Sequence, residues 1–224
     1  MSRVADGLAA VRGRIARACA RAGRDPASVR LVAVSKRHPP EAIREAFGAG
    51  QRLFGENYVQ ELMDKAEALE GLGALRWHFV GHLQRNKAKH VARIGAFVET
   101  VDSPRLARAL DKRAAHEGIT LPVLLQVNVA GEARKSGCAL DALDDLVAEA
   151  RACEGLDVRG LMTIPPFADD PEAARPHFAR LRALAATHGL PELSMGMSGD
   201  LEVAVEEGAT IVRVGTAIFG PRPG

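Results

Sequence analysis

Residues 31–36 read LVAVSK, and the interpretation of the rest of the chain starts from them. This run of small and β-branched residues predicts a buried strand that ends at Lys36. The residues RHPP follow and stop the strand, because Pro39 and Pro40 have the fixed φ angles of a first helical turn. Residues 41–47 then carry apolar side chains at helical spacing. Lys36 is therefore predicted at the C-terminal end of a strand, in a βα loop.

A lysine in this position has two interpretations. In open α/β sheets and in α/β barrels, ligands bind at the carboxyl ends of the strands. A lysine that is partly shielded from water can have a lowered pKa and act as an amine nucleophile. The alternative is a solvated lysine whose alkyl chain lies along apolar surface. Most lysines are solvated, so these six residues alone favour the alternative.

The composition is that of an ordinary globular protein, with 224 residues, 47% hydrophobic and 26% charged. The net charge of +2 is too small to indicate a nucleic-acid partner. Three widely spaced cysteines support neither a disulfide framework nor a zinc ribbon. No apolar run reaches membrane-spanning length, and the arginine-rich N-terminus lacks the apolar core of a secretory signal. We expect a cytoplasmic monomer with no membrane partner and no nucleic-acid partner.

Strands and helices are predicted to alternate along the whole chain. The eight expected strands cover residues 31–36, 52–54, 76–80, 96–101, 121–129, 156–163, 192–194 and 209–214. A helix is expected after each strand except the last, and an extra amphipathic helix precedes the first. Alternation of this kind means parallel strands, so residues 1–224 are predicted to form a single (β/α)8 TIM barrel. The N-terminal helix would fill the gap left by the absent eighth helix, and an open doubly wound sheet is the alternative.

Unusual side chains gather at the C-terminal ends of the predicted strands. They are Lys36, Asn57, His82, Asp102, Asn128, Met162, Ser198, Arg213 and Thr216. In a (β/α)8 barrel these positions share the face that carries active sites. This shared face reverses the preference at Lys36 in favour of a functional lysine.

Two loops on that face have the composition of an anion site. Residues 195–200 read MGMSGD and enter a predicted helix, so Gly199 lets an anion approach the backbone and Ser198 adds a hydroxyl. Gly215 and Thr216, after the last strand, form the second edge of this cradle. Each loop alone is equally well explained as a helix cap with turn glycines. The pair favours phosphate, because phosphate sites after strands seven and eight recur in this fold.

A phosphate cradle opposite a lysine suggests pyridoxal 5'-phosphate (PLP), whose aldehyde forms a Schiff base with an amine. Arg213 lies two residues before Gly215 and points the same way on the strand, toward the expected pyridine nitrogen. A permanently charged guanidinium there would keep that nitrogen unprotonated and weaken the ring as an electron sink. The alternative for Arg213 is a salt-bridged residue of the barrel interior.

Six segments together resemble the signatures of the pyridoxal phosphate homeostasis protein family, which is related to the N-terminal barrel of alanine racemase. They are residues 32–36 (VAVSK), 55–61 (GENYVQE), 77–87 (WHFVGHLQRNK), 161–163 (LMT), 193–200 (LSMGMSGD) and 213–220 (RVGTAIFG). The resemblance covers essentially the whole chain, in order. It implies a fold-type III PLP-binding barrel in which Lys36 holds the cofactor as a Schiff base. It also implies phosphate contacts from Ser198, Gly199, Gly215 and Thr216, a pyridine contact from Arg213, and a ring lined by Asn57 and Met197.

The function that the resemblance implies is PLP homeostasis: the protein binds PLP and balances its free level, which affects amino-acid and keto-acid pools. PLP-dependent apoenzymes are one class of acceptor. The alternative is an amino-acid racemase or another PLP enzyme of low activity. Racemisation needs two bases on opposite faces of the substrate, and Lys36 can serve only one face. In alanine racemase a tyrosine from a second domain of the partner serves the other, and no such domain is expected here, which leaves Tyr58 and His82 as candidates.

The third functional hypothesis is a barrel that binds some other phosphorylated metabolite, with Lys36 as a counter-ion.

Three further features of the sequence have less specific interpretations. His78 and His82 are spaced for a metal but lack a third ligand nearby in the sequence. Cys138 and Cys153 are expected to be ordinary buried thiols. The loop at residues 131–137 contains Lys-Ser but lacks the spacing of a P-loop.

Overall fold

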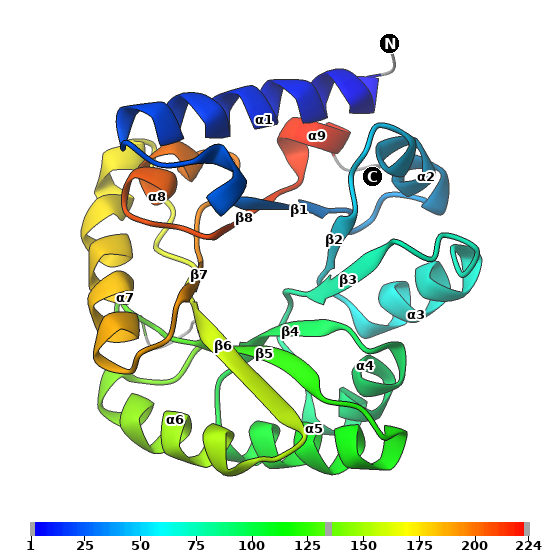
Figure 1. The fold of residues 1–224 in the computed structure, drawn as a ribbon, viewed down its shortest axis with the longest axis vertical. Helices are drawn as coiled ribbons and strands as arrows, with labels where there is room; N and C mark the ends of the chain where they lie inside the picture. Colours follow the sequence, from blue (N-terminus) through cyan, green and yellow to red (C-terminus); the bar gives the residue numbers. More distant parts are fainter. Residues whose placement is uncertain (1–2, 133–135, 222–224) are drawn as a thin grey trace.

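Eight parallel strands close into a barrel in the computed structural model, which describes residues 3–132 and 136–221 (Figure 1). The strands are β1 (Arg30–Val34), β2 (Leu53–Glu56), β3 (Arg76–Phe79), β4 (Phe97–Val101), β5 (Leu121–Gln126), β6 (Leu156–Met162), β7 (Glu192–Ser194) and β8 (Ile211–Val214). Each strand pairs with its neighbour in the chain, and β1 also pairs with β8. This closure confirms the predicted barrel and excludes the open doubly wound sheet.

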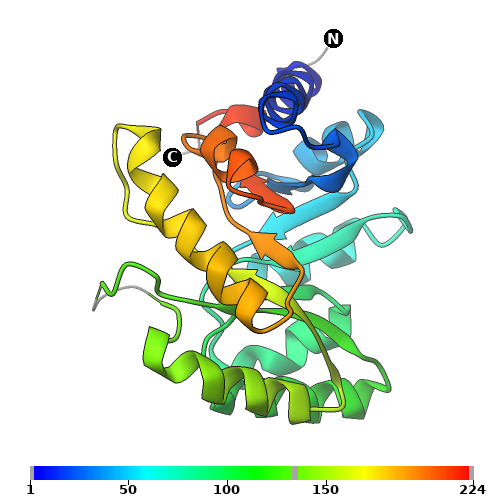
Figure 2. The ribbon, with the colours of Figure 1, turned by 60° about the vertical axis from the view of Figure 1, so that its left-hand side comes forward.

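Helices surround the strands on the outside (Figures 1 and 2). They are α1 (Arg3–Arg21), α2 (Pro40–Gly48), α3 (Val59–Ala68), α4 (Ala88–Ile94), α5 (Pro104–Glu117), α6 (Leu143–Ala152), α7 (Arg175–Thr187), α8 (Leu201–Glu206) and α9 (Thr216–Phe219). The short 3₁₀ turns are η1 (Pro26–Ser28), η2 (Arg85–Lys87), η3 (Leu140–Ala142) and η4 (Pro171–Ala174). Local sequence sets α5 clearly, because Ser103 caps its first turn and Gly118 ends it with a φ of 66°.

Apolar side chains fill two layers. The larger one lies between the strands and the helices, and a smaller one fills the inside of the barrel. The inner layer contains Val32, Val34, Val80, Phe97, Leu124, Met162 and Ile211. Strands β1 and β5 are apolar along most of their length, because both of their faces are buried. All five residues of β4 are also buried, but two of them, Glu99 and Thr100, are polar. The polar exceptions on the strands therefore stand out as candidates for function.

The closing segment differs from the prediction. The last strand was expected to have no helix after it, whereas β8 leads into the short helix α9. The apolar face of α1 packs against α8 and α9 (Figures 1 and 2). The approach is so close at Gly7 that a methyl group there would come within 2.7 Å of the Ile218 carbonyl oxygen. The N-terminal helix thus covers the barrel together with α9.

Three C-terminal strand ends differ from the prediction by two residues or more. The first strand was expected to reach Lys36, but β1 ends at Val34. The second strand was expected to end at residue 54, but β2 continues to Glu56, which is in register with Phe79 of β3. Gly55 and Glu56 resemble a turn by residue type, yet pairing with β3 keeps them in the sheet. The fifth strand ends at Gln126 rather than at residue 129. Residues 133–135 of the loop that follows lie outside the described residues.

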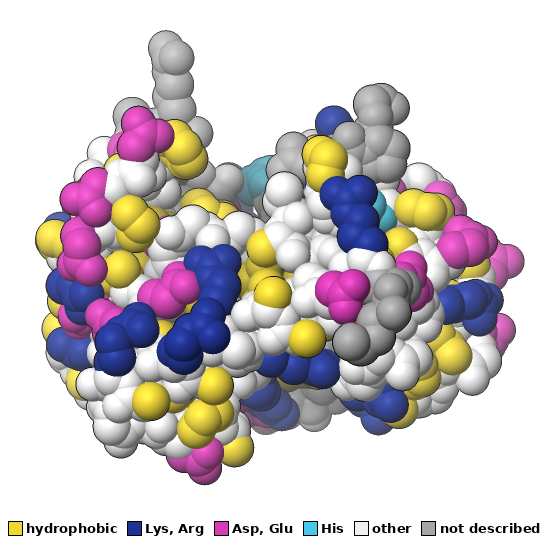
Figure 3. Space-filling view, turned by 90° about the horizontal axis from the view of Figure 1, so that it is seen from above, with side chains coloured by type: hydrophobic (Ala, Val, Ile, Leu, Met, Phe, Trp, Pro, Cys, Tyr) yellow, Lys and Arg dark blue, Asp and Glu magenta, His cyan; other side chains and the backbone are white. Residues whose placement is uncertain are grey.

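The surface is mixed in charge. Seen from the side on which α1 lies, basic and acidic side chains are interspersed (Figure 3). Within residues 3–132 and 136–221, no helix has the length and apolar character that a bilayer crossing requires.

Candidate functional site

The predicted site residues lie on, or shortly after, four strands. They are Lys36 after β1, Asn57 after β2, Met197, Ser198 and Gly199 after β7, Arg213 within β8, and Gly215 and Thr216 after β8. These strands follow one another around the barrel in the order β7, β8, β1, β2. Arg213 is in register with Val32 of β1, and a methyl group at Gly215 would lie 3.0 Å from the Val34 carbonyl oxygen. The fold therefore brings all eight residues to one part of the barrel mouth.

Lys36 sits in the turn after β1, two residues beyond the strand end, and is half-buried. Both of its neighbours are constrained. Ser35 is fully buried, and its hydroxyl donates a hydrogen bond to Glu56 Oε1 at 2.7 Å. Arg37 has a φ of 62°, in the left-handed region that L-residues rarely adopt. Its backbone N–H donates to Glu61 Oε2 at 2.7 Å.

A buried lysine connects these two contacts. The Nζ of Lys65, on α3, donates to the Ser35 carbonyl oxygen at 2.8 Å, to Glu56 Oε1 at 2.7 Å and to Glu61 Oε2 at 2.9 Å. Its side chain is 6% exposed, and that of Glu56 is fully buried. We call Glu56, Glu61 and Lys65 the Lys65 cluster. It lies directly behind the turn that carries Lys36.

The two carboxylates of the Lys65 cluster differ in how readily they hold a proton. Burial raises the pKa of Glu56 above its ordinary value, and Lys65 offsets only part of this effect. Glu56 Oε2 is buried and has no hydrogen-bond partner among the described residues. Burial also acts on Glu61, but the Arg37 N–H and Lys65 outweigh it and lower its pKa. Of the two carboxylates, Glu56 therefore has the higher tendency to hold a proton.

The loop between β7 and α8 presents unpaired backbone donors. Gly196 has a φ of 95°, and a methyl group there would lie 2.5 Å from the Ala204 Cβ, so this turn requires glycine. The Met197 N–H is already occupied, because it donates to Asp200 Oδ1 at 2.6 Å. Among the described residues, the N–H groups of Ser198 and Gly199 donate to no acceptor. Two adjacent free N–H groups in a glycine-containing turn are suited to an anion.

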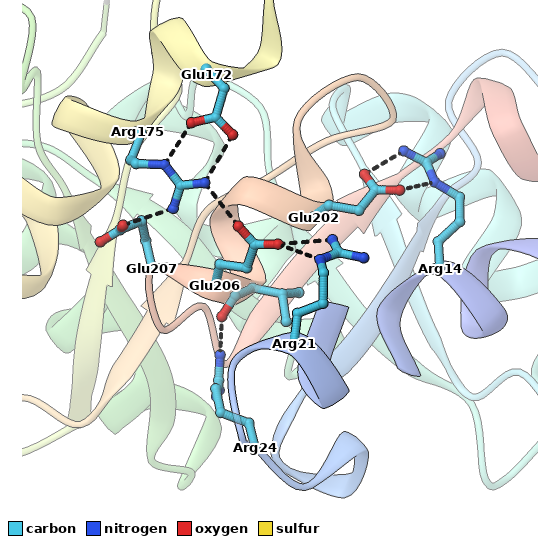
Figure 4. Close-up of polar contacts among 9 residues, drawn as sticks. Arg14, Arg21, Arg24, Glu172, Arg175, Glu202, Glu206 and Glu207 are labelled. Atoms are coloured by element: carbon cyan, nitrogen blue, oxygen red, sulfur yellow. Dashed lines mark hydrogen bonds and ion pairs between the residues drawn. The ribbon is translucent and has the colours of Figure 1, made fainter. Parts of the chain in front are cut away.

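The N-terminal helix holds this loop from outside. Arg14 of α1 donates to the Ser198 carbonyl oxygen at 2.9 Å. It also pairs with both oxygens of Glu202, at 2.6 and 2.7 Å (Figure 4). Arg21 extends the contact to Glu206, which also binds Arg175 (Figure 4). The sequence gives no local signal for this ion-pair network. Arg14 and Arg21 are more than 180 residues from their partners along the chain, and Arg175 is 31 residues from Glu206. It fixes the loop on its outer side.

Arg213 lies inside the barrel and is 4% exposed. Its guanidinium donates to the hydroxyl of Ser194 and, at 3.0 Å, to the carbonyl oxygen of Thr163. Glu99 Oε2 is 3.8 Å from Arg213 Nη1 and accepts a hydrogen bond from Ser194. The other oxygen of Glu99 is 2.6 Å from Nδ1 of His78. We call His78, Glu99, Ser194 and Arg213 the Arg213 cluster.

The charges of the Arg213 cluster are fixed by their neighbours. Burial opposes ionisation of Glu99, but His78, Arg213 and Ser194 outweigh it and lower its pKa. Burial lowers the pKa of Arg213, and the charges of Glu99 and Asp200 oppose that effect. A guanidinium stays protonated in proteins, so Arg213 is a permanent cation here. Salt-bridging inside the barrel, one of the two alternatives for Arg213, is thus observed.

The remaining predicted polar residues lie elsewhere on the mouth. The side chain of His82 is 61% exposed and 3.8 Å from Asp102. These two residues border a separate cavity of about 600 Å³ together with Arg85 and Arg105. His78 points instead to Glu99, a carboxylate near in space though not in sequence, and the described residues contain no group of three potential metal ligands. The two histidines therefore face different carboxylates, Glu99 and Asp102.

Cys138 and Cys153 are buried, as expected, and so is Cys19. Burial raises the pKa of Cys138 to about 12, so its thiol stays protonated and unreactive at neutral pH. Sequence reasoning missed Glu56, Glu61, Lys65 and Glu99. The only local signal was the Glu61–Lys65 pair, whose i,i+4 spacing on a helix allows an ion pair.

The comparisons with known proteins agree with this geometry. A family model described as "Alanine racemase, N-terminal domain" matches residues 7–223. The closed barrel and this match define the class: a (β/α)8 barrel of the alanine racemase N-terminal type. Two curated relatives, from Pseudomonas aeruginosa and Aquifex aeolicus, are 48% and 45% identical to the chain and are both named pyridoxal phosphate homeostasis protein. The alignments cover 99% and 96% of this chain, and 97% and 96% of the relatives.

The chain belongs to the pyridoxal phosphate homeostasis protein family. A solved structure of a similar protein, PipY of Synechococcus elongatus with PLP bound, superposes with a TM-score of 0.86 at 39% identity. The superposition covers 97% of this chain and 100% of PipY.

Proposed function

We propose that this chain binds PLP and acts in balancing its free level in the cell. Family membership and the PLP-bound structure of the similar PipY support this function. The observation that carries it is that a half-buried lysine follows β1 and two backbone N–H groups without an acceptor among the described residues follow β7, on either side of β8 at one barrel mouth. A strand-end amine and an anion cradle at one barrel mouth match the aldehyde and the phosphate of PLP.

The residues around the cradle fit the cofactor. The N–H groups of Ser198 and Gly199, with the hydroxyls of Ser198 and Thr216, would hold the phosphate beside Gly215. Asn57 Oδ1 is buried and has no hydrogen-bond partner among the described residues, so a polar group of a bound ligand would satisfy it. Its backbone is held by close packing, since a methyl group at Gly81 would lie 2.0 Å from the Asn57 carbonyl oxygen. Asn57 and Met197 would line the ring.

We propose that Lys36 forms the covalent bond to PLP. PLP supplies an aldehyde when it is bound. The neutral amine of Lys36 adds to the aldehyde carbon, and water leaves as the C=N bond of the Schiff base forms. Hydrolysis reverses the step, as a carrier requires. Arg213, a permanent cation, would keep the pyridine nitrogen unprotonated and so disfavour carbanion chemistry.

We propose a carrier and regulator rather than a racemase because the site provides one clear base. Tyr58 caps α3 next to Asn57 and is 49% exposed, so its phenol is not held in place by burial. Incubation with L- and D-alanine in deuterated water tests this point. Sustained exchange of the Cα proton would establish an enzyme, and its loss in Tyr58→Phe would identify the second base. No exchange above the rate of free PLP is expected.

The cofactor proposal is tested by the absorbance spectrum of the PLP-loaded protein, followed by borohydride reduction and mass mapping. A single adduct on Lys36 is the expected result. An adduct on another lysine, or an unchanged spectrum with Lys36→Ala, would overturn the assignment. The proposed acceptor is a PLP-dependent apoenzyme. Its recovery of activity on mixing with the loaded protein, compared with an equal amount of free PLP, tests transfer.

A further inference from the structure

Lys36 lies between two residues that are both hydrogen-bonded to the Lys65 cluster. On one side, Ser35 offers its carbonyl oxygen to Lys65 and its hydroxyl to Glu56. On the other side, the N–H of Arg37 donates to Glu61. The cluster thus holds the backbone immediately before and immediately after the lysine.

Lys65 has no donor left for a ligand. An ammonium group has three N–H donors. The three donors of Lys65 are taken up by one acceptor each on Ser35, Glu56 and Glu61, at 2.7 to 2.9 Å. Its side chain is also buried. Lys65 therefore acts only on the protein, and the groups it contacts lie on either side of Lys36.

Stability alone does not account for such a cluster. Buried ion pairs are costly to desolvate, and well-packed apolar residues of similar volume often stabilise a fold as well or better. Charged hydrogen bonds differ from apolar packing because they hold particular backbone atoms, here the Ser35 carbonyl oxygen and the Arg37 N–H, in defined positions. Arg37 shows the need for this, since its left-handed φ of 62° turns the chain sharply just after Lys36 and requires a restraint.

We propose that Lys65, together with Glu56 and Glu61, is a positioning cluster that aims Lys36 at the aldehyde of the bound cofactor. The inference rests on the proposed Schiff base at Lys36. Its consequence is specific. Loss of the cluster weakens the covalent part of PLP binding and leaves the phosphate cradle, on the β7 and β8 loops, unaffected.

The test compares two ligands in Lys65→Met. PLP has the aldehyde, whereas pyridoxine 5'-phosphate has an alcohol in its place and binds through the phosphate and ring alone. We expect the dissociation constant of PLP to rise roughly tenfold or more, because misplacing a reacting group by about 1 Å has effects of this size. The dissociation constant of pyridoxine 5'-phosphate should change less than about twofold. Equal weakening of both ligands, or no change in either, would overturn the inference.

A second variant covers the case in which Lys65→Met fails to fold. Glu61→Ala releases the Arg37 N–H and one of the three Lys65 donors, and it leaves the contacts of Lys65 with Glu56 and Ser35. Glu61 is also partly exposed. This variant should weaken PLP selectively, by a smaller factor. Gln60→Ala is the matched control on the same helix, because Gln60 is exposed and bonds only to Asp64. It should change neither ligand.

The Lys36→Ala background separates this inference from the proposed function. There, Lys65→Met should have no further effect on PLP affinity. If wild-type protein binds PLP no more tightly than pyridoxine 5'-phosphate, the Schiff base proposal fails. If wild type shows the preference and Lys65→Met and Glu61→Ala retain it in full, only the positioning role fails.

Discussion

The two buried charge clusters of the site differ in whether they can change their charge. In the Lys65 cluster, burial raises the pKa of Glu56, so this carboxylate can take up a proton when its partner is lost. In the Arg213 cluster, Glu99 has a lowered pKa and faces a guanidinium that cannot release its proton. The net charge of the Lys65 cluster can therefore change by protonation of Glu56, whereas the net charge of the Arg213 cluster is fixed. The following predictions test this difference, from the largest expected effect to the smallest.

Glu99→Gln should have the largest effect on stability. It removes the main counter-charge of the buried cation Arg213, and breaking such a pair costs about 3–5 kcal/mol. Urea unfolding at pH 7 measures the free energy of unfolding. Glu149→Gln is the matched control, because its pair with Arg108 is exposed and should contribute less than about 1 kcal/mol. A loss no greater than in the control would show that the interior cluster is not fixed by charge.

Lys65→Met should cost less, about 1–3 kcal/mol, although it also removes a buried cation. The reason is that burial already raises the pKa of Glu56, so without Lys65 this carboxylate takes up a proton more readily than Glu99, whose pKa is lowered. The same urea measurement compares it with Glu99→Gln. If Lys65→Met destabilises the protein more than Glu99→Gln does, the proposed contrast between the two clusters is wrong.

The pH dependence of stability should run in opposite directions for the two glutamates. The pKa of Glu56 is raised in the folded state, so its contribution is fully present below the unfolded value of about 4.3 and is lost as the pH rises through the folded pKa. The pKa of Glu99 is lowered, so its contribution is present above about 4.3 and is lost as the pH falls through the folded pKa.

Unfolding free energies of wild type, Glu56→Gln and Glu99→Gln across this range measure both trends. The wild-type advantage over Glu56→Gln should shrink as the pH rises, and the advantage over Glu99→Gln should shrink as it falls into the acid range. Parallel curves for the two variants would contradict the assignment of the adjustable carboxylate to Glu56.

Arg14→Ala should have the smallest effect, because its ion pair with Glu202 is partly exposed and screened by solvent (Figure 4). We expect a loss of about 0.5–1 kcal/mol that diminishes at high salt. The variant also frees the Ser198 carbonyl from its contact with α1. Titration with pyridoxine 5'-phosphate should show a modest loss of affinity, and an unchanged affinity would mean that α1 does not hold the phosphate loop.

Much of the fold followed from local patterns. The β-branched runs and the regular return of helical periodicity predicted eight parallel strands, and caps such as Ser103 and Gly118 marked helix ends correctly. The predictions went wrong at Glu56 and after β8, where residue types typical of a turn or a chain end are overruled by pairing with β3 and by packing against α1. Strand pairing is a long-range interaction, so no local window contains it.

The sequence by itself determined the identity of the strand-end residues, because position along a βα unit decides which residues reach the barrel mouth. Lys36, Ser198, Gly199 and Arg213 were identified in this way, as residues that share one face. Only the tertiary structure decided what lies behind them. Lys65 reaches Ser35 across 30 residues, and Ser194 reaches Glu99 across 95, since closure of the barrel joins segments that the chain keeps apart. Burial and the partners that the closed fold brings together then set the pKa of each carboxylate, raising that of Glu56 and lowering that of Glu99.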